Sequence, residues 1–535
     1  MPIKFLVGDI RLDITSPHSL WKDYDVSALP LNVSALSNKT ENGKCVKEYY
    51  FDGFATVDGK VRAYMSIAEN PSAKGIVLFL GGNNDMNEQD VNTLYDLGYT
   101  VASLDYLGIN DELPHYTLYP KSLDGCNCRG ASNFSAPEDA LSSNWFVWTC
   151  IGRKAIAMIK DLYPQSNIFA VGKGLGGNTV YKLGCFDDGL CGCATLLNIL
   201  PEVSGTGNKI INYRAALDNS AYAKISKIPL FISVASNDED GSFDEMAELA
   251  QSTDSLKCFR IIERGFSGSI DCVYDQIDRF FCDCSAGKTN YPKPTITAVN
   301  SENNLYLNTV IHSDDAEENY KISLYVSFCI ENPKYRNWMG NIPAIKLGNN
   351  EYMSRINVVN SELPIHAFIN ITDSQDNVVS SPLLTIIPKT LKITSHPGVY
   401  HRRIYDSGMG KDVWSSPKGG SIEIKSGPFG IDGVWSSKHS LVTFKPNDLL
   451  FKTDPETLLQ IIAFGKPQTI NIKVADEVTE YNCQVNITNS EEWHKFTLNH
   501  LDFKSSNGPL TDWFKVVMLE LHSDDDFIVS SVLWV

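Results

Sequence analysis

The residues Gly172-Lys173-Gly174-Leu175-Gly176 have the glycine spacing of the motif Gly-x-Ser-x-Gly, whose serine attacks acyl carbonyl groups. The middle residue here is Gly174, which carries no nucleophile. Residues 167–171 before the motif form an apolar run of strand length, and residues 177–183 after it can begin a helix. This is the strand, sharp turn and helix that the motif requires. The turn strains any residue that has a side chain, so a chain that no longer needed the hydroxyl would gain stability from glycine.

The same stretch also contains Gly-x-Gly-x-x-Gly, through Gly172, Gly174 and Gly177, which is the phosphate-binding turn of dinucleotide-binding folds. That function requires the motif to follow the first strand of the sheet, with an acidic residue closing the next strand. Several strand-like runs precede the motif here. The next predicted strand, 194–200, is followed by Pro201 and Glu202, about 30 residues beyond the motif rather than about 20. A nucleotide-binding enzyme is therefore the less favoured interpretation.

The elements around the motif alternate between strands and helices. Apolar runs at 75–80 and 99–106 show no polar alternation, which indicates strands buried on both faces of a parallel sheet. A hairpin around Asp58 and Gly59 precedes them. The remaining predicted elements are an amphipathic helix from Trp148 to Leu162, strands at 194–200, 229–235 and 258–262, and a helix at 270–282.

Over residues 70–285 the chain resembles the α/β-hydrolase superfamily, and acetyl xylan esterases and dienelactone hydrolases in particular. The resemblance is carried by Gly81-Gly82-Asn83 after a buried strand, by Leu104 to Gly108, by Gly152 to Ile156 and by the glycine motif. It implies an α/β fold with a mostly parallel sheet and helices on both faces. We assign residues 1–60 to a β-rich lead-in and residues 61–288 to an α/β-hydrolase-like domain.

The resemblance also implies where an oxyanion site would lie. The backbone N–H groups of Leu175 and of Gly82 or Asn83 are present whatever the side chains, so they could still bind a ligand. Lys173 could contact an anion at the helix N-terminus, although an exposed lysine is the simpler interpretation.

In the resembled family the catalytic acid follows a strand that corresponds to 229–235 here. Asp238 or Asp240 could take this position, and a solvated acidic turn explains them equally well. The family histidine lies in the loop after the last strand, which is Glu263 to Gly268 and includes Phe266 and Ser267. That loop has no histidine. Two members of the catalytic triad are therefore missing at independent positions.

His115 offers a different arrangement. It lies in an insertion at 107–144 that would cap the pocket, together with Cys126 and Cys128, and a cysteine with a histidine can form a nucleophile and base pair. Nothing in the spacing requires these residues to meet, and a surface histidine is the simpler interpretation. We keep His115 as a candidate ligand-binding residue.

The pattern changes near two prolines, Pro292 and Pro294, beyond which short alternating strands replace helices. We assign 292–388 to an immunoglobulin-like β-sandwich. Residues 389–535 resemble galactose-binding-like jelly rolls in the aromatic and acidic spacing of Trp493 to Trp513. We predict a strand over 513–521. Five tryptophans, Trp414, Trp435, Trp493, Trp513 and Trp534, could stack on a sugar, although most tryptophans in a small sandwich belong to its core.

The composition is that of an ordinary globular protein, with 535 residues, 43% of them hydrophobic and 21% charged. A net charge of −18 disfavours nucleic acid and anionic membranes as partners. No apolar run approaches the roughly 18 residues that span a bilayer. The early apolar stretch ends at Asp9, unlike a secretory signal.

The thirteen cysteines are odd in number and thinly spread, unlike a disulfide framework. We therefore expect structural thiols in a cytoplasmic protein, with no metal and no cofactor. A metal or redox site remains the alternative for three Cys-x-Cys pairs, whose spacing differs from that of zinc ribbons: Cys126 and Cys128, Cys191 and Cys193, Cys282 and Cys284.

The favoured hypothesis is thus a catalytically degenerate α/β-hydrolase-like protein that binds a saccharide or another small polar ligand. The alternative is an active carbohydrate esterase or acyl hydrolase with non-standard catalytic residues. The oligomeric state does not follow from the sequence.

Overall fold

The computed structural model describes residues 16–41, 43–82, 88–108, 114–126, 140–186, 189–196, 208–238, 242–266, 273–314, 320–328, 331–340, 342–396 and 398–535. Contacts divide the chain into two units. The first unit comprises Met1–Val234, Glu245–Arg260 and Val273–Tyr291. The second comprises Ala235–Asp244, Ile261–Cys272 and Pro292–Val535.

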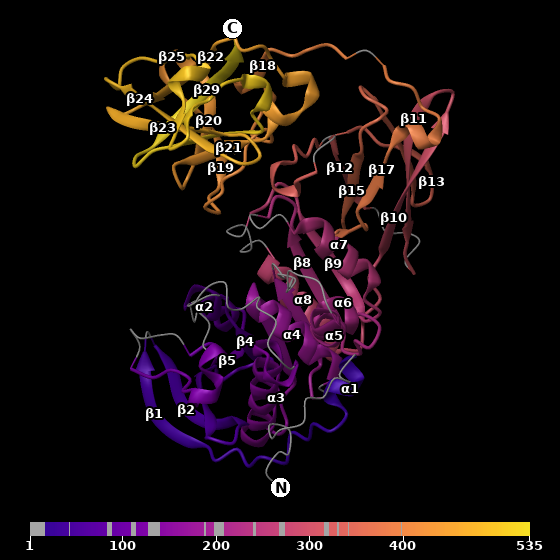
Figure 1. Cartoon of the computed structure of the whole chain (residues 1–535), viewed down its shortest axis with the longest axis vertical. Coiled ribbons are helices and arrows are strands. Elements are labelled where there is room, and N and C mark those ends of the chain that lie inside the picture. The colour runs from indigo at the N-terminus through magenta and orange to yellow at the C-terminus, as the bar shows by residue number, and fades with distance from the viewer. Residues whose placement is uncertain are drawn as a thin grey trace. The chain divides into compact units, whose positions relative to one another are not determined.

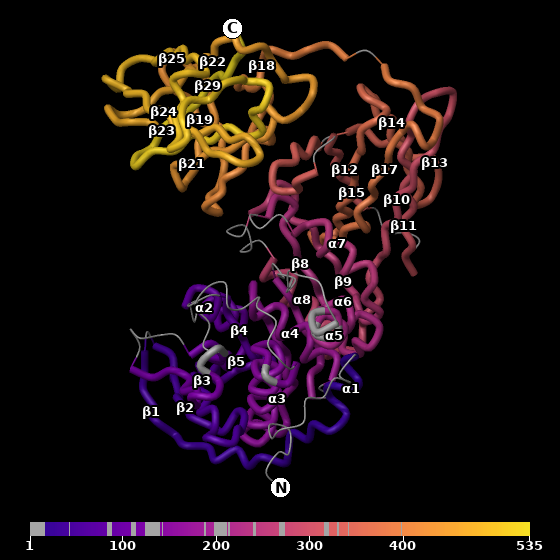
Figure 2. Tube along the Cα trace, viewed as in Figure 1, coloured from indigo at the N-terminus to yellow at the C-terminus, as the bar shows by residue number. Residues whose placement is uncertain are grey.

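A nine-stranded mixed sheet dominates the N-terminal half (Figure 1). Its strands, in the order in which they lie in the sheet, are β1 (Ser34–Glu41), β2 (Lys44–Ala55), β3 (Lys60–Glu69), β5 (Thr100–Asp105), β4 (Ile76–Leu80), β6 (Ile168–Lys173), β7 (Gly192–Leu196), β8 (Leu230–Ala235) and β9 (Leu256–Ile262). Strands β4 to β8 pair in parallel, whereas β1, β2 and β3 form an antiparallel edge. Figure 2 traces β1 and β2 side by side. The hairpin predicted around Asp58 and Gly59 is the β2–β3 pair.

Helices cover both faces of this sheet. Those of the sheet-bearing half are α1 (Pro17–Trp21), α2 (Glu88–Asp96), α3 (Asn144–Leu162), α4 (Leu175–Phe186), α5 (Asn208–Leu217), α6 (Asn219–Tyr222), α7 (Phe243–Ser252) and α8 (Tyr274–Ser285). In β7, a Cβ on Gly192 would lie 3.0 Å from Cys284 Sγ of α8, whereas Cys193 Sγ lies 3.3 Å from the Cβ position of Gly184 in α4. Because neighbouring residues of a strand point to opposite faces, α4 and α8 lie on opposite sides of the sheet.

The remaining strands are antiparallel. Residues 293–386 form two facing sheets. One contains β10 (Lys293–Ser301), β11 (Asn304–His312), β14 (Glu351–Ile356) and β13 (Ile345–Gly348). The other contains β12 (Lys321–Phe328), β15 (Ile365–Thr372), β16 (Val378–Ser380) and β17 (Leu384–Ile386).

Two six-stranded sheets follow in the C-terminal region. One contains β18 (Arg403–Asp406), β19 (Ile422–Ser426), β20 (Asp432–Ser436), β29 (Phe527–Trp534), β22 (Leu459–Gly465) and β25 (His494–Leu498). The other contains β21 (Ser440–Thr443), β28 (Met518–His522), β23 (Gln468–Ala475), β24 (Glu480–Ile487), β26 (Lys504–Ser505) and β27 (Gly508–Pro509).

The predicted fold class is confirmed by this topology, a mostly parallel sheet with helices on both faces followed by all-β structure. The immunoglobulin-like and galactose-binding-like assignments and the four domain boundaries stay predictions. The strand predicted over 513–521 is wrong at its start. Residues Trp513–Lys515 form a 3-10 turn, because the Asp512 carboxylate accepts a hydrogen bond from Phe514 N and caps it, and the strand begins at Met518.

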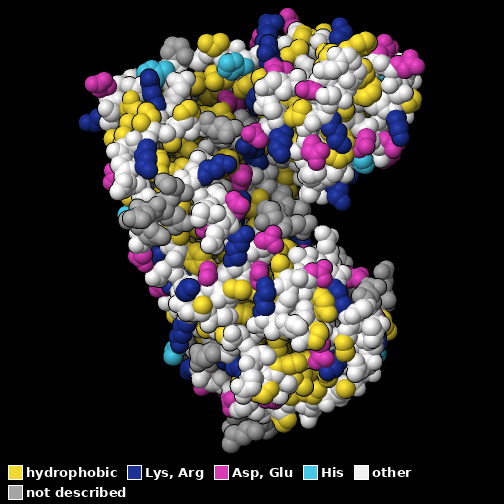
Figure 3. Space-filling view, turned by 180° about the vertical axis from the view of Figure 1, so that it is seen from behind, with side chains coloured by type: hydrophobic (Ala, Val, Ile, Leu, Met, Phe, Trp, Pro, Cys, Tyr) yellow, Lys and Arg dark blue, Asp and Glu magenta, His cyan; other side chains and the backbone are white. Residues whose placement is uncertain are grey.

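Cationic and anionic side chains are interspersed on the face shown in Figure 3. In the part of the chain that the structure describes, no helix is both long enough and apolar enough to cross a membrane.

Helix α4, which follows the glycine motif, is buried from Leu175 to Cys185, and this includes the cation Lys182. Its Nζ donates a hydrogen bond to Asn219 Oδ1 at 2.5 Å and lies 5.3 Å from the ring centres of Trp145 and Tyr222. Burial lowers the pKa of Lys182 to about 7, and the nearby Asp218 opposes this shift. The ammonium therefore sits where its charged form is costly.

The lowered pKa of Lys182 predicts that the free energy of unfolding depends on pH. Its folded pKa lies below that of an unfolded lysine, so the folded protein releases the proton first. Raising the pH from 7 to 10 should then increase the free energy of unfolding, by roughly 2–4 kcal/mol more in the wild type than in Lys182→Met. Urea unfolding at several pH values measures this difference. Lys224→Met, which removes an exposed lysine, should keep the wild-type pH dependence.

Candidate functional site

The glycine motif forms a sharp turn between β6 and α4. Strand β6 ends at Lys173, Gly174 has φ +54°, and α4 begins at Leu175. Gly174 N donates to Leu196 O of β7 at 2.9 Å, and Gly174 O accepts from Gly177 N at 2.9 Å. The predicted strand, turn and helix are therefore present, with glycine in a backbone conformation that other residues adopt only with strain.

The turn lies at the point where the order in which the chain adds strands to the sheet reverses. The chain passes from β4 to β5 on one side of β4 and then returns to β6 on the other side. Ligands of open parallel sheets bind beyond the carboxyl ends of the strands at such a point. Gly82 follows β4 there, and a Cβ on Gly174 would lie 3.8 Å from the Gly82 Cα, the nearest atom among the described residues outside the turn itself. The space above Gly174 is open toward Gly82.

The two outer glycines of the motif serve packing. A Cβ on Gly176 would lie 2.0 Å from Leu80 O, and one on Gly172 would lie 2.3 Å from Gly176 O. Only glycine permits this approach between helix α4 and the sheet. Because close packing accounts for these residues, and the motif follows the sixth strand of the chain, its glycines do not require a nucleotide.

Two backbone donors remain at the start of α4. Within the described residues, the N–H groups of Leu175 and Gly176 have no hydrogen-bond acceptor. Such groups at a helix N-terminus favour an anion or a polarised oxygen. Asn83, the other candidate donor, lies outside the described residues.

Lys173 is not the exposed lysine of the simpler interpretation. Its Nζ lies 3.2 Å from Oδ2 of Asp90, a residue of α2 that is 1% exposed. A ligand at the turn would therefore meet a lysine whose charge is already balanced.

The loop after β8 is held by residues of the β-sandwich region in the same unit. Asn237 Nδ2 donates to Lys334 O at 3.0 Å and to Arg336 O at 2.9 Å. Trp338 Nε1 donates to Ser236 O at 3.2 Å. Asp238 is 4% exposed and accepts a hydrogen bond from Ser242 Oγ at 3.0 Å, whereas Asp240 lies outside the described residues. The candidate acid that can be described is thus buried in a structural loop rather than in a solvated turn.

The loop after β9 is anchored in the same way. Glu263 Oε2 accepts from Asn370 Nδ2 at 3.0 Å, and Arg264 N donates to Ser236 Oγ at 2.7 Å. Phe266 packs against Phe444, with 6.0 Å between ring centres. Ser267 lies outside the described residues. The described part of this loop is thus held by contacts within the second unit.

An ion pair that the sequence did not reveal also links the residues after β8 to the sandwich region of the same unit. Both guanidinium nitrogens of Arg336, which is 1% exposed, contact the carboxylate of Asp244, at 2.5 Å (Nη1 to Oδ1) and 2.7 Å (Nη2 to Oδ2). The two residues are 92 positions apart, so no local pattern could indicate the contact.

His115 packs among aromatic rings. Its ring centre lies 6.1 Å from that of Tyr50 and 6.0 Å from that of Tyr64. Cys128 and the side chain of Cys126 lie outside the described residues, so the hypothesis of a cysteine and histidine pair stays untested.

The tryptophans of the C-terminal region divide into two groups. Trp414, Trp513 and Trp534 are at most 4% exposed and belong to the core between the two six-stranded sheets. Trp435 and Trp493 are partly exposed. Among the residues that the structure describes, no group of three or more histidine, cysteine or acidic side chains could hold a metal ion.

Solved structures of several esterases are similar to about half of the chain. An acetyl xylan esterase from Paenibacillus sp. R4 shares 12% identity and a TM-score of 0.38, over 52% of this chain and 95% of that one. A glucuronoyl esterase from Solibacter usitatus shares 12% identity and a TM-score of 0.35, over 51% and 92%. Est1E from Butyrivibrio proteoclasticus shares 12% and 0.31, over 47% and 99%. No family model and no curated protein matches the chain. Similarity at this level assigns no activity.

The packing predicts an order of stability for glycine substitutions. Gly176→Ala should lower the free energy of unfolding by more than about 3 kcal/mol, because its methyl group would overlap the Leu80 carbonyl. Gly174→Ala should cost only about 1 kcal/mol, the strain of a positive φ. Gly287→Ala is a matched control, with φ +70° and nothing within 4 Å of its Cβ position. If urea unfolding shows that Gly174→Ala lowers the free energy of unfolding as much as Gly176→Ala does, the space above Gly174 is not open.

Proposed function

We propose that this protein is a catalytically inactive α/β-hydrolase-like protein that binds a small polar ligand, such as a saccharide, where β4 and β6 end. The observation that carries the proposal is Gly174, a residue without a nucleophile at a positive-φ turn whose side-chain space is open. The N–H groups of Leu175 and Gly176 lie beside that space, and Gly82 borders it. A ligand oxygen would accept hydrogen bonds there in place of the oxyanion of an acyl transfer reaction.

Besides the missing hydroxyl at Gly174, two further features favour binding over catalysis. The loop from Glu263 onward contains no histidine, and Asp238 is bonded to Ser242 in a buried loop. The base that a serine would need is therefore missing along with the serine.

The C-terminal sheets belong to the same proposal. We infer an immunoglobulin-like sandwich followed by a galactose-binding-like jelly roll. Its partly exposed Trp435 and Trp493 are the aromatic side chains that a sugar would contact, and a sugar on Trp435 would use the ring face that Lys425 does not cover. The thin, odd-numbered distribution of cysteines supports a cytoplasmic location.

The proposal predicts no esterase turnover. Hydrolysis of p-nitrophenyl acetate by the wild type and by Gly174→Ser should equal the rate in buffer, since a restored serine would still lack a base. Gly174→Ala controls for the strain at this position. An active acyl hydrolase with non-standard residues is indicated instead if the wild type turns over substrate and Asp238→Asn abolishes the reaction, or if a fluorophosphonate labels a serine.

Ligand binding is tested by calorimetric titration with xylotriose and with sodium acetate. At least one probe should bind, and Gly174→Leu should weaken that binding at least tenfold by filling the space toward Gly82. Gly287→Leu carries the same backbone strain elsewhere in the first unit and should bind as the wild type does. If Gly174→Leu binds the probe unchanged, or neither probe binds at about 10 mM, the proposed site is wrong.

A further inference from the structure

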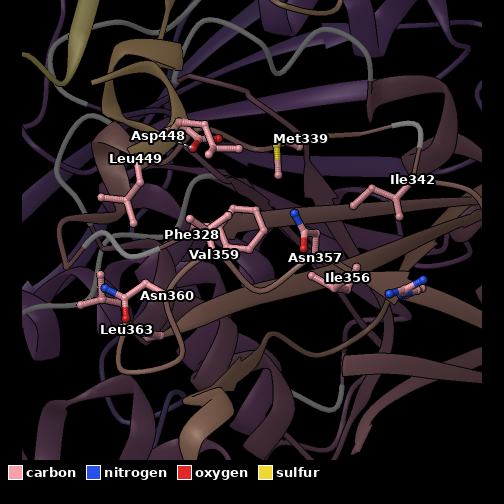
Figure 4. A pocket seen from close by; sticks show the side chains of 13 residues that line it. Phe328, Met339, Ile342, Ile356, Asn357, Val359, Asn360, Leu363, Asp448 and Leu449 are labelled. Carbon is pink, nitrogen blue, oxygen red and sulfur yellow. Dashed lines mark hydrogen bonds between the residues drawn. The ribbon is translucent and has the colours of Figure 1, made fainter. Parts of the chain in front are cut away.

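A pocket of about 200 Å³ lies within the second unit (Figure 4). It is bordered by the end of β12, by the segment from β14 to Pro364 and by the short turn Leu449–Phe451. Nine of its thirteen described lining residues are apolar: Phe328, Met339, Ile342, Ile356, Val359, Leu363, Pro364, Leu449 and Leu450. Water in such a space makes few hydrogen bonds and is readily displaced by an apolar group.

Hydrogen bonds hold the walls of the pocket together. Asn447 Nδ2 donates to Tyr335 O at 2.6 Å, which ties the segment before the Leu449–Phe451 turn to the sandwich region. His401 N donates to Leu450 O at 2.7 Å, and His396 N donates to Val358 O at 2.7 Å. The segments that line the pocket are therefore held in place by hydrogen bonds within this unit.

One carboxylate, that of Asp448, borders this apolar space (Figure 4). Asp448 is 5% exposed, and its Oδ1 accepts a hydrogen bond from Leu450 N at 3.0 Å. Burial raises the pKa of Asp448, whereas the Leu450 N–H, His401, Lys445 and Asn337 favour the ionised form. In the described part of the chain no cation lies within 4 Å of this carboxylate.

The charges of Lys445 and His401 act on Asp448, but neither cation lies within 4 Å of its carboxylate. Lys445 donates to Ile404 O at 2.9 Å and to Met409 Sδ at 3.4 Å. Arg355, the single cation among the described lining residues, is exposed and donates to Asn304 Oδ1 at 2.5 Å. A buried carboxylate without an ion partner is costly, and a cationic group brought by a ligand would stabilise it.

We propose that this pocket binds small primary amines with a compact apolar body, whose ammonium group pairs with Asp448 while the body lies among the apolar side chains. The Phe328 ring and the Met339 sulfur face the same space and suit such a body. A volume of about 200 Å³ holds roughly six or seven groups the size of a water molecule or a methylene. Hexylammonium matches this size, and it is a probe for the class rather than the natural ligand.

The test is calorimetric titration of the full chain with hexylammonium chloride, sodium hexanoate and 1-hexanol at equal ionic strength. Hexylammonium should bind the wild type at least tenfold more tightly than hexanoate, because the chains are alike and only the head groups differ. Asp448→Asn keeps an acceptor for Leu450 N but loses the charge, so it should weaken hexylammonium binding at least tenfold and leave hexanol unchanged. Asp454→Asn removes an exposed carboxylate from the same region and should have no effect.

A second variant keeps the proposal testable if Asp448→Asn does not fold. Leu363→Trp fills the pocket and should abolish binding of hexylammonium and hexanol alike. The proposal is overturned if hexanoate binds as tightly as hexylammonium, if Asp448→Asn binds hexylammonium like the wild type, or if Leu363→Trp leaves binding intact. The pocket does not include the glycine turn, so these outcomes are independent of the proposed function.

Discussion

The close approach of helix α4 to strands β4 and β6 is the constraint on which the rest of the first unit depends. At Gly176 and Gly172 the backbones come so near that a Cβ would lie 2.0 Å or 2.3 Å from a carbonyl oxygen. Within the described residues, this contact places the start of α4, whose first N–H groups have no acceptor there, beside the space above Gly174. It also accounts for the two outer glycines of the motif, which close packing requires.

The two loops that follow β8 and β9 are held by contacts within the second unit. Residues 236–238 and 263–266 are joined to the sandwich region by hydrogen bonds from Asn237, Trp338 and Asn370, and Phe266 packs on Phe444 of the C-terminal region. The Arg336 and Asp244 pair adds a two-point contact with a buried guanidinium. The polar groups of these loops thus join segments of the chain that are far apart in the sequence.

Two of the buried charged side chains, Lys182 and Asp448, have opposite signs and shifted pKa values. Lys182 is enclosed by α4, Asn219 and two aromatic rings, and its pKa falls to about 7. Asp448 borders an apolar pocket, and burial raises its pKa. In each case the cost of burying a charge is only partly offset by neighbouring groups. Lys182 is sealed inside helical packing and bears on stability, whereas Asp448 faces a cavity that a ligand could enter.

The sequence alone determined the order of strands and helices, because unbroken apolar runs such as Ile76 to Leu80 mark strands buried on both faces. It also located the turn at Gly174, because local spacing reports local geometry. The strand predicted over 513–521 was wrong at its start, because the Asp512 side chain caps a 3-10 turn there and the strand begins only at Met518. Only the tertiary structure decided that Lys173 pairs with Asp90, that Arg336 reaches Asp244 and that Asp448 borders a pocket. The two ion pairs join residues 83 and 92 positions apart, and no periodicity in a single chain reports distances set by how the chain folds back on itself.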